Sequence, residues 1–474
     1  MSGKVGAIAG DTAVTHSVEC ARLTEFKQFL NKLVKDSVNN AAYYGDGARL
    51  CISRSSNETY PVCTQEVPAE IIMTLWNSLL LKQCPRYFQI PILRKAVADI
   101  EGGCRNAKEC DVSTSVKQAE SATDANNKAE MVYDLVKLQK YVVNNLEKLL
   151  TRLTDNTEAG NLQNYAEAGS LCADGEECKC NAPTTAIQQP PVSFTAGHIK
   201  NKPRKMEDRH VCLDRYSDLY ELKQQQYSFY GVFDGHSGPL AACYATSQLP
   251  YILATSLKEI NNDVADVTLY REAFENAFLQ TDKMFCQKGI SSGTTAVCVL
   301  LAHPTVRSNQ SHLYVAWVGD SKALLVSPTV SLQLVKSHKP DAADERKRIE
   351  AAEGGGTVMY VQGQWRVNGI LNVSRSIGDY TVVPAIAEPD FVDVPLTPAH
   401  DFIVLGTDGL FDHVPEPMLV ETIYKSLADA EQRVENIPKV LIELAKEGDS
   451  QDNITVVIVF LKNRSNIVQN FKSV

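Results

Sequence analysis

Acidic residues mark the ends of several strand-like runs in the second half of the chain. Asp234, Asp320 and Asp408 each follow an apolar run that is typical of a buried strand, and Asp452 precedes another. If those strands lie side by side, such ends can gather on one edge, where uncompensated carboxylates would repel one another strongly. Divalent cations would remove that repulsion, and ligation by oxygen alone favours Mg²⁺ or Mn²⁺ over zinc.

Each aspartate alone has a simpler interpretation, because a strand-terminal Asp often just caps a loop. Asp234 and Asp408 are followed by glycine, and Asp-Gly is foremost a turn dipeptide. The set is more informative, and the acidic pair Glu207-Asp208 joins it just before another strand-like segment. Two hard cations held by shared carboxylates suit in-line displacement at phosphorus. The sequence contains neither a C-x5-R loop nor a G-x-x-x-x-G-K-[ST] loop that would favour another route.

Length and composition indicate a globular protein of two or more domains. The chain has 474 residues, of which 44% are hydrophobic and 22% charged. The formal net charge is −10, which argues against a large nucleic-acid or anionic-membrane surface. We therefore expect neither nucleic acid nor membrane as a partner.

Cysteine usage indicates a reducing compartment. The chain has 13 cysteines, no N-terminal secretory signal pattern and no apolar run of the length that spans a bilayer. We expect free thiols in the cytosol or the nucleus. The cluster Cys172, Cys178 and Cys180 lacks a second cysteine or histidine pair, so we favour free thiols there over a soft metal.

The first third of the chain, residues 1–153, is predicted to be helical, with segments at His16–Asn39, Pro68–Gln83 and Asn126–Leu153. The third segment carries a stripe of apolar residues at gaps of three and four: Leu135, Leu138, Val142, Leu146, Leu149 and Leu153. We favour a small bundle that packs on itself over an interaction or dimerisation helix that would recruit a protein partner. Residues 154–192 read as a linker.

Strands and turns dominate from Ser193 onward. Residues 193–463 are predicted to form one domain, followed by a tail at 464–474. Helical patterns cover about Pro239–Leu257, Leu269–Lys288 and Asp344–Glu353. The strand-like runs are His210–Leu213, Phe229–Phe233, Gly293–Leu301, Leu313–Val318, Leu324–Val326, Phe402–Thr407 and Ile454–Leu461.

Seven short motifs in this region resemble, in content and order, those of the metal-dependent PP2C (PPM) serine/threonine phosphatases. The resemblance covers about Ser193–Leu461, and Lys205–His210 looks most like the calmodulin-dependent-kinase phosphatase (partner-of-PIX) branch. The motifs are Met206-Glu207-Asp208, Phe233-Asp234-Gly235-His236, Ser292–Ala296, Val318–Ser321, Val373–Asp379, Thr407–Asp412 and Ser450–Asn453.

The resemblance implies an α+β sandwich of two mainly antiparallel sheets flanked by helices, with two Mg²⁺ or Mn²⁺ ions at one end. It also implies that His236 is the general acid for the leaving alkoxide. Seven positions match the family's metal ligands: Asp234 as the bridge between two ions, the Gly235 carbonyl on one of them, Asp408 and Asp452 on the first ion, Glu207 on the second, partly through water, and Asp320 and Asp412 at a weaker third site.

The sequence departs from the family pattern at a few positions. Pro203 stands where a phosphate-binding arginine is common, and Lys202 and Arg204 beside it are the candidates to replace that arginine. Lys322 replaces an arginine and Ser337 an aspartate, and the lysine expected soon after Asp379 is absent. None of these changes removes a core metal ligand.

We therefore expect a protein phosphatase that hydrolyses phosphoserine and phosphothreonine proteins by direct attack of a metal-bound water, with Asp234 and His236 as catalytic residues. Asp341–Asn372 should form a flap beside the site. Trp365–Gly369 either shapes its rim or forms a tight hairpin with Asn368-Gly369 as the turn. The alternative functions are a catalytically weak scaffold that acts through its helical region and, far less favoured, a metal-dependent nuclease.

Overall fold

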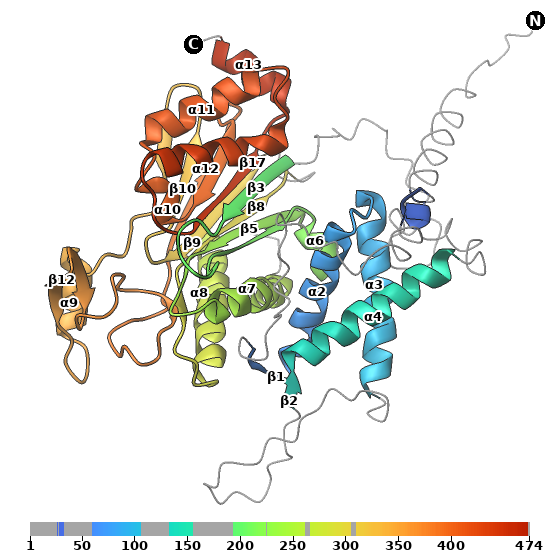
Figure 1. The fold of residues 1–474 in the computed structure, drawn as a ribbon, viewed down its shortest axis with the longest axis horizontal. Coiled ribbons are helices and arrows are strands. Elements are labelled where there is room, and N and C mark those ends of the chain that lie inside the picture. Colours follow the sequence, from blue (N-terminus) through green and yellow to red (C-terminus); the bar gives the residue numbers. More distant parts are fainter. Residues whose placement is uncertain are drawn as a thin grey trace, which may run out of the picture. The chain divides into compact units, whose positions relative to one another are not determined.

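The structure, a computed structural model, describes residues 26, 28–32, 59–105, 132–154, 193–223, 225–260, 266–304 and 310–472. The chain divides into two units, Met1–Ala186 and Ile187–Val474, and Figure 1 shows the elements of each. No helix in the described ranges combines the length and the apolar character that a membrane span needs.

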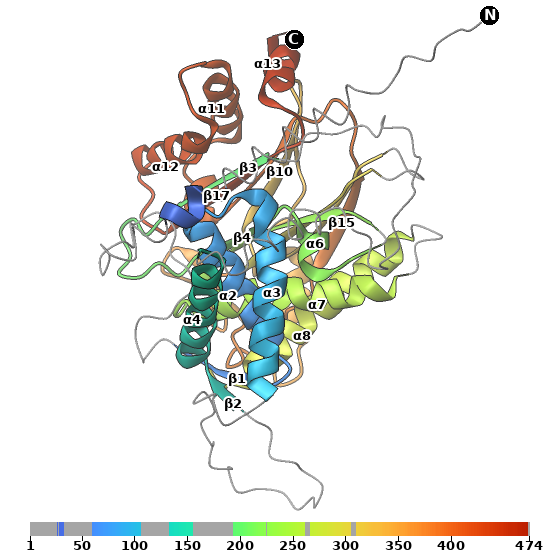
Figure 2. The ribbon, with the colours of Figure 1, turned by 90° about the vertical axis from the view of Figure 1, so that its right-hand side faces the viewer.

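The described residues of the N-terminal unit include the helices α2 (Val67–Leu81), α3 (Arg86–Arg105) and α4 (Leu135–Thr154), besides the helical residues 26 and 28–32. The short strand β1 (Pro61–Cys63) pairs antiparallel with β2 (Val132–Asp134). Helix α4 begins where the Asp134 carboxylate accepts a hydrogen bond from the Lys137 amide at 2.8 Å. It packs against α2 and α3, which stand beside it in Figure 2.

The apolar stripe of α4 is the core of this unit. All six residues predicted to form the stripe are at most 4% exposed: Leu135, Leu138, Val142, Leu146, Leu149 and Leu153. The bundle interpretation is therefore supported. The predicted helix starts too early, because Val132–Asp134 is a strand, and α3 was not predicted, because Pro91 interrupts its pattern. Of the segment His16–Asn39, the described residues 26 and 28–32 are helical, and the predicted linker lies almost wholly outside the described residues.

Two five-stranded antiparallel sheets form the middle of the second unit, in the orders β11-β10-β16-β17-β3 and β15-β9-β8-β5-β4. The strands of the first sheet are β3 (Ser193–Ile199), β10 (Lys322–Val326), β11 (Ser331–Gln333), β16 (Phe402–Gly406) and β17 (Ile454–Phe460). Those of the second are β4 (Arg209–Leu213), β5 (Tyr227–Phe233), β8 (Ala296–Ala302), β9 (His312–Val318) and β15 (Asp390–Pro395).

Alternation along the strands explains why the sheets pack on both faces. In β10, Ala323 and Leu325 join the core between the two sheets, whereas Leu324 and Val326 face helices. The first sheet is covered by α10 (Asp408–Phe411), α11 (Glu416–Ala428), α12 (Ile437–Glu447, preceded by the 3₁₀ turn Val434–Asn436) and α13 (Arg464–Lys472). The second contacts α7 (Leu240–Glu259) and α8 (Val267–Cys286), and α6 (Tyr216–Tyr220) packs on β5. The predicted α+β sandwich is confirmed.

The residues assigned to a tail belong to this sandwich. Helix α13 occupies most of residues 464–474, and its Ile467 is fully buried in the core beneath α11 and α12. Phe471 of the same helix stacks on Tyr424 of α11, with ring centroids 4.3 Å apart. The domain therefore continues through α13.

A small third sheet, in the order β14-β7-β6, was not predicted as a separate sheet. Its strands are β6 (Gly235–His236), β7 (Gly293–Thr294) and β14 (Ile377–Gly378). His236 and Gly378 both stand opposite Gly293, on its two sides. Strands of two residues carry no periodicity, so sequence patterns cannot reveal them.

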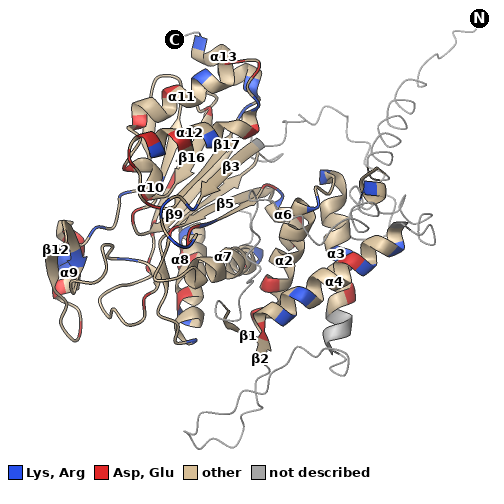
Figure 3. Cartoon of the chain, viewed as in Figure 1, with Lys and Arg blue, Asp and Glu red and all other residues tan. Residues whose placement is uncertain are grey.

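The predicted flap contains α9 (Ala343–Glu350) and a hairpin of β12 (Val358–Val361) and β13 (Gln364–Val367). The β12–β13 hairpin turns at Gln362-Gly363, both with positive φ. The chain reverses again at Asn368-Gly369, also with positive φ, where an antiparallel bridge joins Val367 to Leu371 and the Ile370 amide donates to the Val367 carbonyl at 2.9 Å. The interpretation of Asn368-Gly369 as a tight turn is therefore confirmed. Charged residues of this unit lie mainly on helices and on loops at the strand ends (Figure 3).

Candidate active site

Two glycines bring the acidic segments together. A side chain at Gly235 would collide with the backbone of Glu207, and one at Gly409 would collide with the backbone of Asn453. Neither glycine has positive φ, so both are required for close approach of two chain segments and not for a turn. Each Asp-Gly pair therefore sets an aspartate beside another acidic segment, Asp234 beside Glu207 and Asp408 beside Asp452-Asn453.

The aspartates that follow the strands lie close enough to shift one another's ionisation. Loss of hydration raises the pKa of Asp234 well above its ordinary value, and the charges of Asp208, Asp408, Asp320 and Asp452 raise it further. Loss of hydration likewise raises the pKa of Asp408 to about 7, with contributions from Asp320, Asp452 and Asp412. The predicted aspartates thus share one electrostatic environment.

Asp208 is a site residue that the sequence reasoning left without a role. It is 3% exposed, and its Oδ2 accepts hydrogen bonds from the Thr407 hydroxyl at 3.1 Å and the Thr455 hydroxyl at 2.8 Å. Burial raises its pKa to about 7, although the two hydroxyls oppose that shift. Its position directly after Glu207 is the sequence feature that could have identified Asp208 as a site residue. The carboxylate ties β4 to the ends of β16 and β17.

Asn453, also without an assigned role, fixes the segment before β4. Its side-chain amide donates to the carbonyls of Lys200 at 2.7 Å and Lys205 at 3.1 Å, and its Oδ1 accepts from the Glu207 amide at 2.7 Å. Glu207, which is half-buried, is thereby held at the edge of the acidic cluster. An asparagine satisfies all three partners because its amide both donates and accepts.

Two lysines pair with the carboxylates predicted for a weaker third ion. The Lys339 ammonium forms an ion pair with Asp320, which is 3% exposed. Lys322 lies 3.4 Å from the exposed Asp412 and 5.7 Å from the centre of the Phe411 ring. Lys322, which replaces the family's arginine, therefore still meets a carboxylate of the site.

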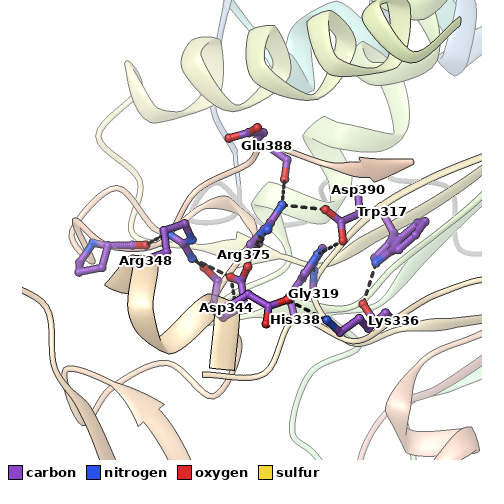
Figure 4. Close-up of polar contacts among 12 residues, drawn as sticks. Trp317, Gly319, Lys336, His338, Asp344, Arg348, Arg375, Glu388 and Asp390 are labelled. Carbon is purple, nitrogen blue, oxygen red and sulfur yellow. Dashed lines mark hydrogen bonds and ion pairs between the residues drawn. The ribbon is translucent and has the colours of Figure 1, made fainter. Parts of the chain in front are cut away.

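A polar network around His338, Arg375 and Asp390 contacts the end of β9 through Gly319 (Figure 4). The Gly319 amide donates to Nδ1 of the buried His338 at 3.1 Å, and His338 Nε2 lies 3.2 Å from Asp390. Arg375 donates to Asp390 at 3.1 Å and to the Glu388 carbonyl at 3.0 Å. The network fixes the backbone that leads into Asp320.

The basic residues around Pro203 are exposed. Lys202 and Arg204 make no hydrogen bond or ion pair with the residues that the structure describes. The Lys200 ammonium donates to the Pro203 carbonyl at 2.6 Å, which fixes the loop between them. Both side chains remain available to an anion, on a segment that Asn453 anchors.

His236 lies on β6, two residues after Asp234. Its side chain is 27% exposed, and its Nε2 lies 2.7 Å from Oδ2 of Asp379. This contact joins the Phe233–His236 motif to the Val373–Asp379 motif, although 143 positions separate the two residues.

The acidic side chains do not form a closed cage. Among the described residues, no group of three or more His, Cys, Asp or Glu side chains is arranged to hold one ion. Mg²⁺ does not require such a cage, because it usually keeps several waters and is bound through one or two carboxylates. The available donors are oxygens, and the raised pKa values of Asp234 and Asp408 mark negative charge that a cation would compensate. The residues present therefore fit hard divalent cations.

Comparison with a family model agrees with this fold. The model described as protein phosphatase 2C matches residues 192–454, more than half of the chain. The chain therefore belongs to the protein phosphatase 2C family, and the predicted resemblance is confirmed.

Similarity to individual curated proteins indicates the branch of the family to which the chain is most similar. Protein phosphatase 1E of Mus musculus is 38% identical over 276 residues, which are 57% of this chain and 35% of that protein. Protein phosphatase 1F of Homo sapiens is 37% identical over 277 residues, 57% of this chain and 57% of that protein. The chain thus matches only about a third to just over half of the length of these relatives. The matches agree with the branch predicted from Lys205–His210.

A solved structure extends the likeness to nearly the whole chain. The structure of a C. elegans sex determining protein aligns with a TM-score of 0.64 and 20% sequence identity, covering 95% of this chain and 97% of that one. At this identity the likeness shows the fold alone. It includes the helical unit as well as the two-sheet sandwich.

Proposed function

We propose that this protein is a metal-dependent phosphatase that hydrolyses phosphoserine and phosphothreonine in proteins. The observation that carries the proposal is the shared electrostatic environment of Asp234, Asp408, Asp320 and Asp452 within a protein phosphatase 2C fold. Backbone packing at Gly235 and Gly409 brings these segments together, and bound divalent cations would offset the mutual repulsion of the aspartates that results.

The residues of the site have two proposed roles, which are to bind the metal ions and to donate a proton to the leaving group. When bound, two Mg²⁺ or Mn²⁺ ions would supply an activated water and neutralise charge on the phosphoryl oxygens. Asp234, the Gly235 carbonyl, Asp408 and Asp452 would hold them, supported by Glu207. His236 would donate a proton to the serine or threonine oxygen as the bond from phosphorus to that oxygen breaks.

Phosphate recognition falls to the basic residues that the fold leaves exposed. Lys202 and Arg204 flank Pro203 on the segment that Asn453 anchors beside Glu207. We propose that Arg204, with its two-pronged guanidinium, contributes more than Lys202. The cytosol or the nucleus remains the predicted compartment.

Hydrolysis of p-nitrophenyl phosphate by the full chain, with Mn²⁺ and with or without EDTA, tests the proposal. We expect activity that EDTA abolishes and that Asp408→Asn lowers at least about a hundredfold, the scale of losing a major electrostatic contribution to the transition state. Asp393→Asn is the control, because Asp393 lies on β15 and pairs with His312 at 3.4 Å, outside the site. Activity that persists in EDTA would contradict the metal mechanism, and a properly folded chain with no activity would favour the scaffold alternative.

A further inference from the structure

The contact between His236 and Asp379 lies in the small sheet β14-β7-β6. Gly293 of β7 is paired with His236 on one side and with Gly378 on the other. A Cβ at Gly293 would collide with both the Asp379 carboxylate and His236 Nε2. The absence of a side chain at Gly293 thus leaves the space in which His236 and Asp379 meet.

Asp379 is held in place independently of His236. The Ser376 hydroxyl donates to its Oδ2 at 2.6 Å, and its own amide donates to the Ser292 carbonyl at 3.2 Å. Asp379 has φ of 51°, in the left-handed region that non-glycine residues rarely adopt. Such a conformation persists only where the surroundings enforce it.

Helix α8 enforces that turn. The Asp282 carboxylate on α8 accepts a hydrogen bond from the Gly378 amide at 2.7 Å. Gly378 itself has φ of 95°, and a side chain there would collide with the Ser292 carbonyl. The Asp379 side chain is only 9% exposed. The Asp379 carboxylate is thus nearly buried, lies in a turn that other residues hold in place, and contacts the His236 ring. We take this arrangement to indicate a specific role for the contact between the two side chains.

We infer that Asp379 is a positioning residue for His236, which it orients so that Nδ1 faces the substrate. The Asp379 carboxylate accepts a hydrogen bond from Nε2, and Nδ1 has no hydrogen-bond partner among the described residues. The inference rests on the proposed function, in which His236 is the general acid.

With a phosphoserine substrate, water forms the new bond to phosphorus while the bond from phosphorus to the serine oxygen breaks. The electron pair of the broken bond passes to the serine oxygen, and the two protons of the water leave with the phosphate product. The oxygen takes the proton from Nδ1, and His236 is left neutral with its remaining proton on Nε2, directed at Asp379. A serine alkoxide is a poor leaving group, so its departure depends strongly on receiving this proton. p-Nitrophenolate is a stable anion and can leave without the proton.

The test therefore compares leaving groups in the full chain with Mn²⁺: a phosphoserine peptide, phenyl phosphate and p-nitrophenyl phosphate. We expect Asp379→Asn to lower kcat about a hundredfold on the peptide, less on phenyl phosphate and under about threefold on p-nitrophenyl phosphate, with KM little changed. In a His236→Ala background, Asp379→Asn should cause no further loss, because a residue that acts only through another has nothing left to act on.

A second variant, Gly293→Ala, tests the same contact if Asp379→Asn folds poorly. Gly293→Ala separates the pair by inserting a methyl group between the two side chains, and we expect the same dependence on the leaving group. Asp393→Asn, in the His312–Asp393 pair between β9 and β15, should leave kcat on all three substrates unchanged. Equal losses of kcat on all three substrates, or additive losses in the double variant, would overturn the inference. Absence of hydrolysis by the wild-type chain would overturn the proposed function, and the inference with it.

Discussion

Gly235 and Gly409 explain how aspartates far apart in the sequence come to share one environment. Each is packed so tightly against the backbone of another acidic segment that a methyl group would not fit. The contacts place Asp234 beside the Glu207 segment and Asp408 beside the Asp452-Asn453 segment. The acidic site is therefore assembled by close packing of backbones, and the cations would compensate the charge that this packing gathers.

The crowding of carboxylates predicts a conflict between stability and activity. Asp408→Asn removes one of the charges that raise the pKa of Asp234, so in EDTA the variant should be more stable than wild type by about 1 kcal/mol. Mg²⁺ should raise the midpoint of thermal unfolding of wild type, because the ion binds only the folded chain. The variant should respond much less.

Thermal unfolding with and without Mg²⁺ measures both effects without using activity. Asp393→Asn is the matched control: Asp393 is 34% exposed and pairs with His312 outside the acidic site, so we expect its replacement to change stability in EDTA by less than about 0.5 kcal/mol. A lower stability of Asp408→Asn in EDTA would show that the aspartates do not repel one another in the folded chain.

Glu345 connects the flap to the strand that leads into Asp320. This residue of α9 is 5% exposed and accepts hydrogen bonds from Arg375 at 2.6 Å and from the Ser374 hydroxyl at 2.6 Å. Arg375 also binds Asp390, the partner of His338. Burial alone would raise the pKa of Glu345, but the hydrogen bonds from Arg375, Ser374 and Arg348 outweigh it and lower the pKa to about 2.

That lowered pKa makes the contribution of Glu345 to stability dependent on pH. Because the folded-state pKa lies below the ordinary value of 4.5, the contribution is complete above about pH 4.5 and is lost as the pH falls toward 2. Glu345→Gln should therefore destabilise the domain by about 3 kcal/mol at pH 7, the low end for breaking a buried ion pair. The difference from wild type should fall to about half at pH 3.

Urea unfolding at pH 7 and pH 3 measures this difference. Glu350→Gln is the control on the same helix: Glu350 is 55% exposed and pairs with Arg346 at 3.1 Å, so its replacement should cost less than about 0.5 kcal/mol at either pH. If the loss in Glu345→Gln were the same at both pH values, ionisation of Glu345 would not be its cause.

For the whole molecule, the long periodic segments could be predicted from the sequence. The stripe of α4, the strands β5, β9 and β17, and the motifs that carry Asp234 and Asp408 were all recognised, because burial on a strand or helix leaves a regular apolar pattern. The family resemblance then supplied the sandwich of two sheets, which the structure and the comparisons confirm.

The features that escaped prediction are those that depend on contacts distant in sequence. The two-residue strands β6, β7 and β14 have no period, and the hydrogen bonds of Asp208 and Asn453 depend on partners more than 190 positions away. Helix α13 was read as a tail because only Ile467 of its residues is fully buried. Asp379 lay inside a recognised motif, but its contact with His236 spans 143 positions.

The division into two units predicts that damage to the helical core leaves catalysis intact. Leu146 of α4 is fully buried, so Leu146→Ala should destabilise the N-terminal unit by about 2–5 kcal/mol. Every residue placed in the acidic site belongs to the second unit, so Mn²⁺-dependent hydrolysis of p-nitrophenyl phosphate should be unchanged. Calorimetry of the full chain should show the unfolding transition of the N-terminal unit shifted to lower temperature and that of the second unit unchanged. Glu147→Ala is the control at the adjacent position of α4, where the side chain is 55% exposed, and it should shift neither unfolding transition. If Leu146→Ala lowered both the rate of hydrolysis and the stability, the helical unit would be required for the activity of the second unit.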